Sequence, residues 1–217
     1  MATVLNIAQD AETYDVKCGQ KTLTFTNLQK VFWPQLHKTK RDLLIYYAAV
    51  SDVLLPHLRD RALVIKRYPN GVEEKLLLMK KAPAYRPEWF KVCPVMRSSG
   101  SIVDLPVIQD LASLLWAVNL GCIDICHWPV RCDDMHRPDY VYFDLDPIFP
   151  AEFPQAREAA LLVKDFFQKR ALTLTLKQPD CAVSTSIYRS IASLTKGRSG
   201  RPLNRLPVRW QKSIRPC

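Results

Sequence analysis

The stretch Tyr140-Val141-Tyr142-Phe143-Asp144-Leu145-Asp146-Pro147 decides both the fold class and the chemistry that this sequence suggests. Its aromatic and β-branched residues predict a buried β-strand, which the proline ends. Side chains two positions apart in a strand share a face, with Cα atoms roughly 6.5 Å apart. Asp144 and Asp146 are therefore predicted to point in the same direction, while the apolar residues between them face the core.

Two neighbouring carboxylates repel each other unless a cation lies between them. Carboxylates at this spacing can bridge two divalent ions roughly 3.5–4 Å apart, the arrangement that stabilises the attacking and leaving oxygens in phosphoryl transfer. Hard oxygen ligands favour Mg²⁺ or Mn²⁺. We therefore predict that Asp144 and Asp146 are metal ligands and catalytic residues. The alternative is a solvated strand end, because Asp-x-Asp pairs are common on loops.

A second candidate site lies upstream, where Thr39 and Asp42 approximate a capping box and predict a helix that begins at Lys40. The amino end of a helix offers free amide donors and the positive end of its dipole, so it is a ready anion site. Asn27 and Lys30 precede it and can fold back onto it. We predict that Asn27, Lys30 and Lys40 bind a phosphate, such as that of a nucleic-acid end. The alternative is that both lysines are ordinary solvated residues.

Further cations surround a predicted turn at Pro69-Asn70-Gly71. Lys66 and Arg67 end the strand before this turn, where two cations can follow a nucleic-acid backbone or a triphosphate. Lys80 and Lys81 can extend the same patch. We therefore predict that Lys66, Arg67 and Lys80 contact DNA or a nucleotide.

Composition limits the class of protein. The chain has 217 residues, of which 48% are hydrophobic and 24% charged, which is typical of one mid-sized globular domain and excludes collagen and low-complexity disorder. Its apolar runs are shorter than the roughly 18–20 residues of a membrane span, and we expect no membrane partner. The acidic start does not resemble an export signal, so we expect a cytoplasmic protein whose seven cysteines are reduced.

The net charge of +10 is distributed unevenly along the chain. Residues 170–217 contain ten Lys and Arg and one acid, whereas residues 1–169 contain 21 bases and 20 acids. The high pI therefore says nothing about the body of the chain. An argument for nucleic-acid binding has to rest on particular residues.

Periodicity along the chain predicts an α+β fold, with apolar faces that alternate between the periods of strands and helices. After Gln178 the apolar residues are sparse and follow neither period, so we expect residues 178–217 to be a basic, disordered tail. Strands are expected at 22–25, 62–68, 101–108, 122–128, 140–146 and 173–176, helices at 39–56, 110–121 and 152–169, and a helical turn or loop at 27–33.

Cysteines and histidines crowd into one stretch, at Cys122, Cys126, His127, Cys132 and His136. Their spacing is not the Cys-x-x-Cys pattern of structural zinc sites. The favoured interpretation is small buried residues and one packed histidine. A nucleophilic Cys–His pair stays open, although no oxyanion-hole motif accompanies it.

Several stretches together resemble the polymerase (primase-like) module of bacterial DNA ligase D. Their order and spacing agree with the family over about residues 20–170. The stretches are Leu23 to Pro34, Thr39 to Asp42, Tyr46-Tyr47, Ile65 to Val72, Leu115-Trp116, Asn119 to Gly121, and Phe143 to Pro147.

The resemblance implies an archaeo-eukaryotic primase-like fold with mixed sheets and flanking helices. It also implies a nucleotidyltransferase of nonhomologous end joining that fills gaps and extends ends. Such a module acts on double-stranded DNA ends carrying a 5′-phosphate, uses Mn²⁺ or Mg²⁺ with nucleoside triphosphates, and has Ku and a ligase module as partners in the bacterial cytoplasm, at the nucleoid.

By position, the resemblance assigns metal binding to Asp144 and Asp146 and the 5′-phosphate pocket to Asn27, Lys30 and Lys40. Two aromatic residues of the family stack on the template base, and the corresponding residues here are leucines, Leu77 and Leu78. Leucine has no π-face, which weakens stacking on a base.

The sequence departs from the family after Lys177. The family's Gly-Leu-His-Val strand and third metal-binding Asp are missing. Read in a codon frame displaced by two bases, residues 179–186 can encode Gly-Leu-Arg-Gly-Leu-His-Val-Tyr, so we hypothesise a frameshift just before Gln178. The domain prediction is thus an incomplete polymerase module at residues 1–177 followed by a non-family tail at 178–217.

Two of the three metal-binding carboxylates remain, so we predict that catalysis is impaired. One alternative is an inactive DNA-end-binding module that recognises a 5′-phosphate through Asn27, Lys30 and Lys40. Another is a basic-tailed RNA or DNA binder of a different fold.

Overall fold

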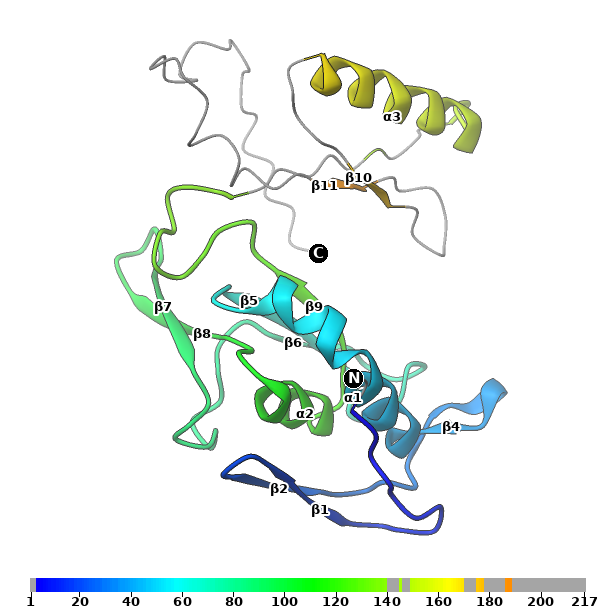
Figure 1. The fold of residues 1–217 in the computed structure, drawn as a ribbon, viewed down its shortest axis with the longest axis vertical. Helices are drawn as coiled ribbons and strands as arrows, with labels where there is room; N and C mark the ends of the chain where they lie inside the picture. The colour runs from blue at the N-terminus through cyan, green and yellow to red at the C-terminus, as the bar shows by residue number, and fades with distance from the viewer. Residues whose placement is uncertain (1–2, 140–144, 146–148, 170–174, 178–185, 189–217) are drawn as a thin grey trace. The chain divides into compact units, whose positions relative to one another are not determined.

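The structure is a computed structural model that describes residues 3–139, 145, 149–169, 175–177 and 186–188 (Figure 1). It divides into two compact units, Met1–Met135 and His136–Cys217. The mixed α and β content agrees with the predicted class.

The first unit contains two helices, one 3₁₀ turn and nine short strands in its described residues. In chain order these are β1 (Tyr14–Cys18), β2 (Lys21–Phe25), β3 (Val31–Trp33), η1 (Pro34–Leu36), β4 (Lys38–Thr39), α1 (Lys40–Leu58), β5 (Leu63–Arg67), β6 (Leu77–Met79), β7 (Val92–Met96), β8 (Ile102–Pro106), α2 (Leu111–Asn119) and β9 (Cys122–His127).

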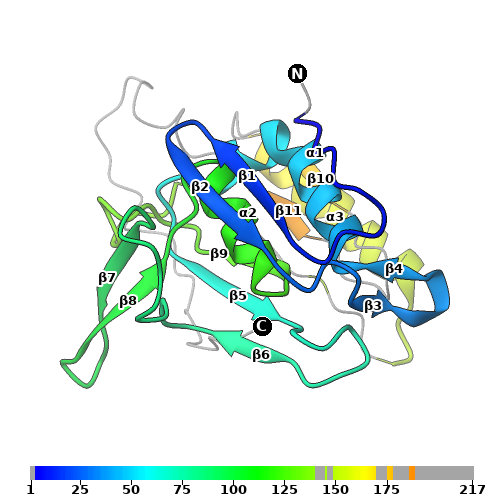
Figure 2. The same ribbon diagram turned by 90° about the horizontal axis from the view of Figure 1, so that it is seen from below.

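Small antiparallel sheets organise this unit. The largest has the strand order β6-β5-β9, with Ile65 opposite both Met79 and Ile125. Strands β1 and β2, β3 and β4, and β7 and β8 form separate two-stranded ribbons. The β1–β2 hairpin packs on α2, and Figure 2 shows both of its strands beside that helix.

The start of helix α1 is set by a complete capping box. The Thr39 side chain accepts a hydrogen bond from the Asp42 amide, and the Asp42 carboxylate accepts one from the Thr39 amide. This confirms the predicted start. The predicted end was wrong, because Pro56 lies inside the helix, which continues to Leu58. A proline in the last turn removes a single intrahelical bond.

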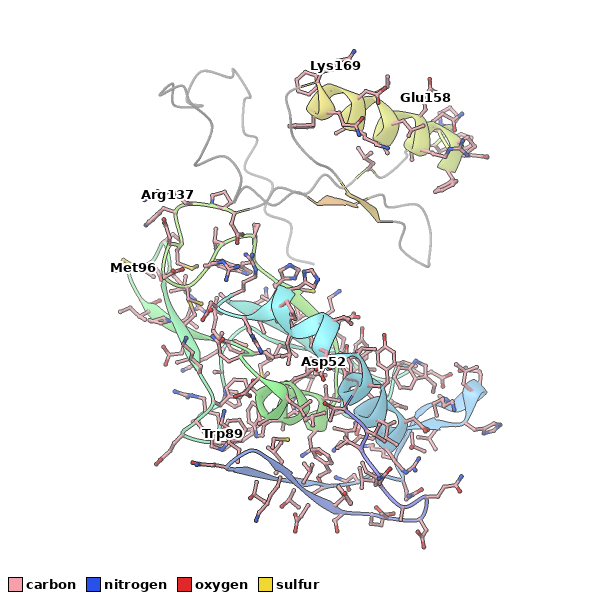
Figure 3. The ribbon with its side chains drawn as sticks, viewed as in Figure 1. Asp52, Trp89, Met96, Arg137, Glu158 and Lys169 are labelled. Atoms are coloured by element: carbon pink, nitrogen blue, oxygen red, sulfur yellow. The ribbon has the colours of Figure 1, made fainter. Side chains whose placement is uncertain are left out.

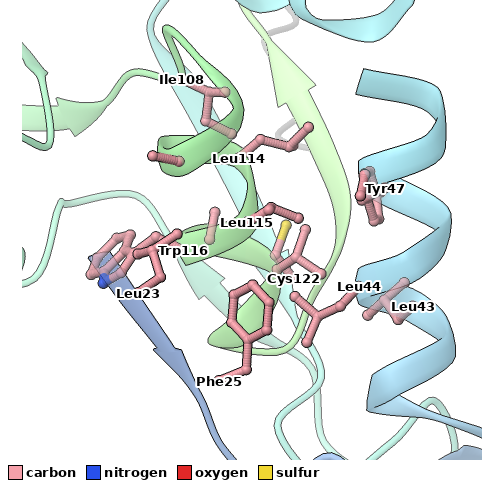
Figure 4. Packing of buried hydrophobic residues seen from close by; sticks show 14 of the residues in the cluster. Leu23, Phe25, Leu43, Leu44, Tyr47, Ile108, Leu114, Leu115, Trp116 and Cys122 are labelled. Atoms are coloured by element: carbon pink, nitrogen blue, oxygen red, sulfur yellow. The ribbon is translucent and has the colours of Figure 1, made fainter. Parts of the chain in front are cut away.

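The main core lies between α1, α2 and β2. Figure 4 shows Phe25 of β2 and Leu44 of α1 directed toward Leu115 of α2, and all three side chains are fully buried. Burial of each such side chain contributes about 1.5–3 kcal/mol. Helix α2 begins at the predicted cap, where Asp110 accepts from the Ser113 amide at 2.9 Å. It ends before Gly121, whose φ of +82° favours glycine.

A second, smaller core lies beneath the β7–β8 ribbon. Its buried members are Ala62, Cys93, Val103, Leu105 and Val107. The sequence pattern missed β7 because Pro94 interrupts it, although an exposed proline is tolerated on an edge strand. Met96, at the end of β7, is 72% exposed (Figure 3).

Residues 27–30 form the predicted turn or loop, but the prediction was wrong for Val31–Trp33, which is a strand paired with β4. A contact between β3 and a distant segment of the chain helps to explain this conformation. The Phe32 carbonyl accepts a hydrogen bond from the Val72 amide at 3.0 Å, a contact across 40 positions that local propensity does not encode.

The second unit contains helix α3 (Phe153–Gln168) and the antiparallel hairpin of β10 (Thr175–Lys177) and β11 (Ser186–Tyr188). Helix α3 confirms the predicted helix, but its buried residues are Ala156 and Ala160. Leu162 and Phe166 of this helix are exposed. Strand β11 falls inside the segment expected to be a tail. The predicted strand 140–146 lies outside the described residues except for Leu145.

Candidate anion-binding pocket

A pocket of about 260 Å³ opens on the first unit. Four separate segments line it: the turn that follows β2, the first residue of α1, the end of β5 with the turn behind it, and the end of α2. Asn27, Lys30 and Lys40, predicted together as a phosphate site, all line this pocket, as does Arg67. The structure therefore brings these four side chains together, although Asn27 and Arg67 are 40 positions apart in the sequence. We call it the Lys40 pocket.

Lys40 is held at the back of the pocket. It is only 5% exposed, and its Nζ donates a hydrogen bond to the Thr26 carbonyl at 2.6 Å. An ammonium group carries three N–H donors, so this bond uses one of them. Lys30 lies beside it, with its Nζ donating to Asn70 Oδ1 at 2.6 Å.

Arg67 supplies a third cation to the same pocket. Its Nε donates to the Leu120 carbonyl at 2.8 Å, which ties the guanidinium to the end of α2. Lys66, its neighbour on β5, does not line the pocket and forms an ion pair with Asp124 at 3.7 Å. Successive residues of a strand point to opposite faces, and the register of β5 also shifts between Lys66 and Arg67. Of these two cations Arg67 alone lines the pocket, and contact of both with DNA or a nucleotide stays a prediction.

Asn27 and Asn119 shape the rim of the pocket. Asn27 has a φ of +55°, a left-handed conformation that asparagine tolerates better than most residues. Asn119 Oδ1 accepts from the Thr26 amide at 3.2 Å, and its Nδ2 donates to the Thr24 carbonyl at 3.1 Å. The Asn119 amide thus holds the backbone that presents the Thr26 carbonyl to Lys40.

Close backbone approach fixes the turn that contributes Pro69 and Asn70 to the pocket lining. A Cβ added to Gly71 would lie 3.2 Å from the Phe32 and Val31 carbonyl oxygens, and the φ of Gly71 is +98°. The predicted turn at 69–71 is confirmed by the Gly71 amide, which donates to the Tyr68 carbonyl at 3.1 Å. A side chain at Gly71 would therefore push the turn, with Pro69 and Asn70, away from the pocket.

The first-turn amides of α1 do not serve as the anion donors that the sequence suggested. The Lys40 amide donates to the Lys30 carbonyl at 2.9 Å, and the Arg41 amide donates to the Leu28 carbonyl at 3.1 Å. The Asp42 amide donates to the Thr39 side chain. These three amides are therefore not available to an anion in the pocket, and the charged donors that line it are the side chains of Lys30, Lys40 and Arg67.

The electrostatics of the pocket favour an anion. Burial lowers the pKa of Lys40 from its usual 10.5 to about 8, and the positive charges of Lys30 and Arg67 act in the same direction. Three cations that repel one another in a partly desolvated space lose that repulsion when a negative group lies between them. The charge and size of the pocket therefore make it a candidate site for a compact anion.

The remaining predicted contacts lie elsewhere. Lys80 is exposed and follows β6 outside the pocket lining. Leu77 and Leu78 are 43% and 42% exposed on β6, where Leu77 is opposite Arg67 in the sheet register. Apart from this short leucine run, nothing in the sequence pattern indicates that β6 is a strand.

The predicted metal ligands Asp144 and Asp146 lie outside the described residues. Across the described ranges, no group of three or more His, Cys, Asp or Glu side chains is arranged to hold a metal ion. Cys122 is fully buried, in line with its interpretation as a small core residue. Burial is also the main reason that its thiol pKa is well above the usual range.

Residues 39–178 match the family described as the LigD primase-polymerase domain. The chain belongs to this family. Membership confirms the resemblance drawn from the sequence. Curated relatives of the chain are named as non-homologous end joining proteins.

Two curated LigD relatives illustrate the match. The Bacillus subtilis bifunctional non-homologous end joining protein LigD is 32% identical over 151 residues, which are 70% of this chain and 24% of that protein. The multifunctional LigD of Mycobacterium tuberculosis strain H37Rv is 29% identical over 155 residues, 68% of this chain and 20% of that protein. The chain thus spans about a quarter or less of these relatives.

A solved structure shows the same fold. The polymerase domain of Mycobacterium tuberculosis ligase D, determined in complex with DNA, superposes with a TM-score of 0.69 at 24% identity. The match covers 78% of this chain and 61% of that domain. The LigD primase-polymerase fold is therefore present here. Among the described helices none is long and apolar enough to cross a membrane.

Proposed function

We propose that this LigD-family chain is a DNA-end-recognition module of non-homologous end joining, and that the Lys40 pocket binds the 5′-phosphate of a double-stranded end. The observation that carries the proposal is the convergence of Lys30, Lys40 and Arg67 on one pocket, with Lys40 almost fully buried. A buried cation is costly without a partner. A terminal phosphate, with a charge near −2, supplies one.

The donors suit a phosphate in number as well as in charge. Lys30 and Lys40 each use one of three ammonium protons on a neighbouring oxygen, and Asn27 adds an amide side chain at the rim. Charge-assisted hydrogen bonds are roughly twice as strong as neutral ones. A 5′-hydroxyl end lacks the charged oxygens, so it forgoes these bonds.

The polymerase part of the proposal rests on Asp144 and Asp146. Two carboxylates are suitable ligands for Mn²⁺ or Mg²⁺, which would stabilise charge during nucleotidyl transfer from a nucleoside triphosphate. The family's third carboxylate has no counterpart in the sequence, where Asp180 is the sole acid after Asp165. We therefore propose, as the first candidate function, an end-recognising nucleotidyltransferase whose catalysis is impaired. The second candidate function is an inactive module that binds DNA ends without nucleotidyl transfer.

Other partners follow from the family. Lys66 and Lys80 are proposed contacts to the DNA backbone outside the pocket. Ku and a ligase module are proposed protein partners, since the full-length relatives are named as multifunctional end-joining proteins. The proposed location is the bacterial cytoplasm, at the nucleoid.

Binding and catalysis are tested separately. Fluorescence anisotropy at about 150 mM salt, where exposed charges are largely screened, compares two duplexes that differ solely in a 5′-phosphate or a 5′-hydroxyl at the recessed end. Tighter binding of the phosphorylated duplex supports the proposal, and equal affinities contradict it. Primer extension with Mn²⁺ and ribonucleotides then separates the two candidate functions. Extension that is lost in Asp144→Asn indicates a polymerase, whereas binding without extension indicates the inactive module.

A further inference from the structure

The second core contains three sulfur-bearing side chains, those of Cys93, Cys132 and Met135, and none of them lines the Lys40 pocket. Cys93 on β7 is fully buried, and its Sγ lies 3.9 Å from Met135 Sδ. The Cys132 side chain is hydrogen-bonded to Cys93 and is partly exposed. Cys132 also packs against the core cluster that contains Cys93, so two thiols 39 positions apart in sequence are neighbours, one inside the core and one at its surface.

Backbone hydrogen bonds on both sides hold the two cysteines in this position. Cys93 lies opposite Leu105 in the β7–β8 ladder. The Cys132 amide donates to the Asp60 carbonyl at 2.7 Å, and the Asp60 carboxylate accepts from Lys91 Nζ at 3.1 Å. The backbone segments that carry the two thiols are thus held in place by the fold.

We propose that Cys93 and Cys132 are an oxidative modification site, at which a peroxide converts the two thiols to an intramolecular disulfide. In the first step the Cys132 thiolate attacks a peroxide oxygen, which gives a sulfenic acid and, with a proton, water. The Cys93 sulfur then attacks the Cys132 sulfur and displaces the hydroxyl group as a second water. Two thiols lose two electrons in total, and one hydrogen peroxide becomes two waters.

The surroundings favour the disulfide as a product. Desolvation raises the pKa of Cys132 to about 12, the Cys93 thiol acts in the same direction, and Lys91 and Asp60 nearby oppose each other. A disulfide carries no charge, so it avoids the free-energy cost that a thiolate has in this partly desolvated site. The same pKa makes the reaction slow at neutral pH, because the thiolate is the nucleophile.

Two consequences distinguish this site from random oxidation. The rate should rise about tenfold per pH unit between about pH 7 and 9, as the thiolate fraction of Cys132 rises. The bond would also close a loop that contains β8, α2 and β9, so the oxidised chain should melt about 5–10 °C higher than the reduced chain.

The experiment treats the full chain with hydrogen peroxide, alkylates the remaining thiols, and maps linked peptides by mass spectrometry before and after dithiothreitol. The expected result is one dithiothreitol-sensitive link between Cys93 and Cys132, with the seven thiols reduced to five. Cys18→Ser, which alters a partly buried cysteine on β1, is the matched control and should keep the link and the rise in melting temperature.

Cys132→Ser is the decisive variant, because it changes the partly exposed sulfur and leaves the buried Cys93 in place. It should lose the link, the pH-dependent thiol loss and the rise in melting temperature together. The inference is overturned if Cys132→Ser loses two thiols as fast as the parent chain. It is also overturned if the linked peptides join other cysteines or if oxidation stops at sulfinic acid.

Discussion

Positive charge occurs in two contrasting settings in this protein. In the Lys40 pocket, three cations from different elements converge, and Lys40 is 5% exposed. In residues 178–217, eight Lys and Arg occur with one acid, among Ser, Gly and Pro. The second region carries most of the chain's net charge of +10. The first is the region that we propose to distinguish a terminal phosphate from a terminal hydroxyl.

The difference shows why the pI of a chain is a poor guide to its binding site. Diffuse cations release counterions from any nucleic acid and give affinity that falls steeply with salt. Cations fixed in a pocket confer selectivity, because their distances suit one kind of group. We expect the two regions to contribute to affinity and to selectivity, respectively, so variants that change one region at a time should separate the two properties.

The largest expected effect is that of Lys40→Met on selectivity. Methionine fills much of the space of the lysine stem without its charge, so preference for a 5′-phosphate end over a 5′-hydroxyl end should fall about 10- to 100-fold, equivalent to the loss of one or two charge-assisted bonds. Anisotropy titrations with both duplexes measure this preference.

Lys38→Met is the matched control for that change. Lys38 lies two positions away on β4 and is exposed, so its replacement makes the same change in net charge outside the pocket. The preference for the phosphorylated end should be retained. An equal loss in both variants would mean that net charge, and not the pocket, sets selectivity.

The second effect concerns the basic C-terminal segment. The triple change Arg201→Gln, Arg205→Gln and Arg209→Gln should weaken binding to every duplex by about tenfold at low salt. The slope of log affinity against log salt should fall by up to about 2–3. The ratio between phosphorylated and hydroxyl ends should stay constant, and a change in that ratio would undermine the division between the two regions.

The third effect is a pH dependence that is set by Lys40. With a pKa of about 8, its charged fraction falls from about nine-tenths near pH 7 to a few per cent near pH 9.5. The preference for a 5′-phosphate should therefore decline several-fold over this range in the parent chain and remain flat in Lys40→Met. Parallel declines in both proteins would assign the titration to another group.

The same shift has a consequence for stability, with a definite sign. The pKa of Lys40 is lowered in the folded state, so the unfolded chain binds more protons between pH 8 and 10.5. The contribution of Lys40 to the free energy of unfolding should therefore rise with pH across this interval. Urea denaturation of the parent chain and Lys40→Met at about pH 7.5 and pH 10 measures the difference between them.

The smallest effect is expected for Asn27→Gly. Glycine accepts the φ of +55° without strain, so stability should change little while the amide at the pocket rim is lost. Selectivity for the phosphorylated end should fall about threefold, the value of one weak hydrogen bond. Asn27→Ala is the comparison, because it loses the same amide and adds strain, which thermal unfolding would detect.

Local signals in the sequence predicted much of the frame around the pocket. The Thr39–Asp42 capping box, the Asp110 cap and the turn at 69–71 are each encoded within a few residues, and all three are confirmed. The capping box places Lys40 in the first turn of a helix. Because that signal is local, the sequence alone was sufficient to identify this lysine as a candidate phosphate ligand.

Long-range contacts explain what the sequence left out. The amides of Lys40 and Arg41 are taken by carbonyls of Lys30 and Leu28, and no local pattern shows this. Asn119 acts on the backbone at Thr24 and Thr26 from 95 and 93 positions away. Strand alternation favours different directions for Lys66 and Arg67, but the register shift between them is set by pairing with the distant strand β9 and could not be predicted from the local sequence.

The central claim is that the Lys40 pocket receives the terminal phosphate of a DNA end. A crystal structure of the chain with a short 5′-phosphorylated duplex tests it most directly. We expect phosphate oxygens within hydrogen-bond distance of Lys40 Nζ and Lys30 Nζ, with Arg67 facing the same group. A bound duplex whose 5′-phosphate lies on another surface, while Lys40 keeps no anion beside it, would contradict the account.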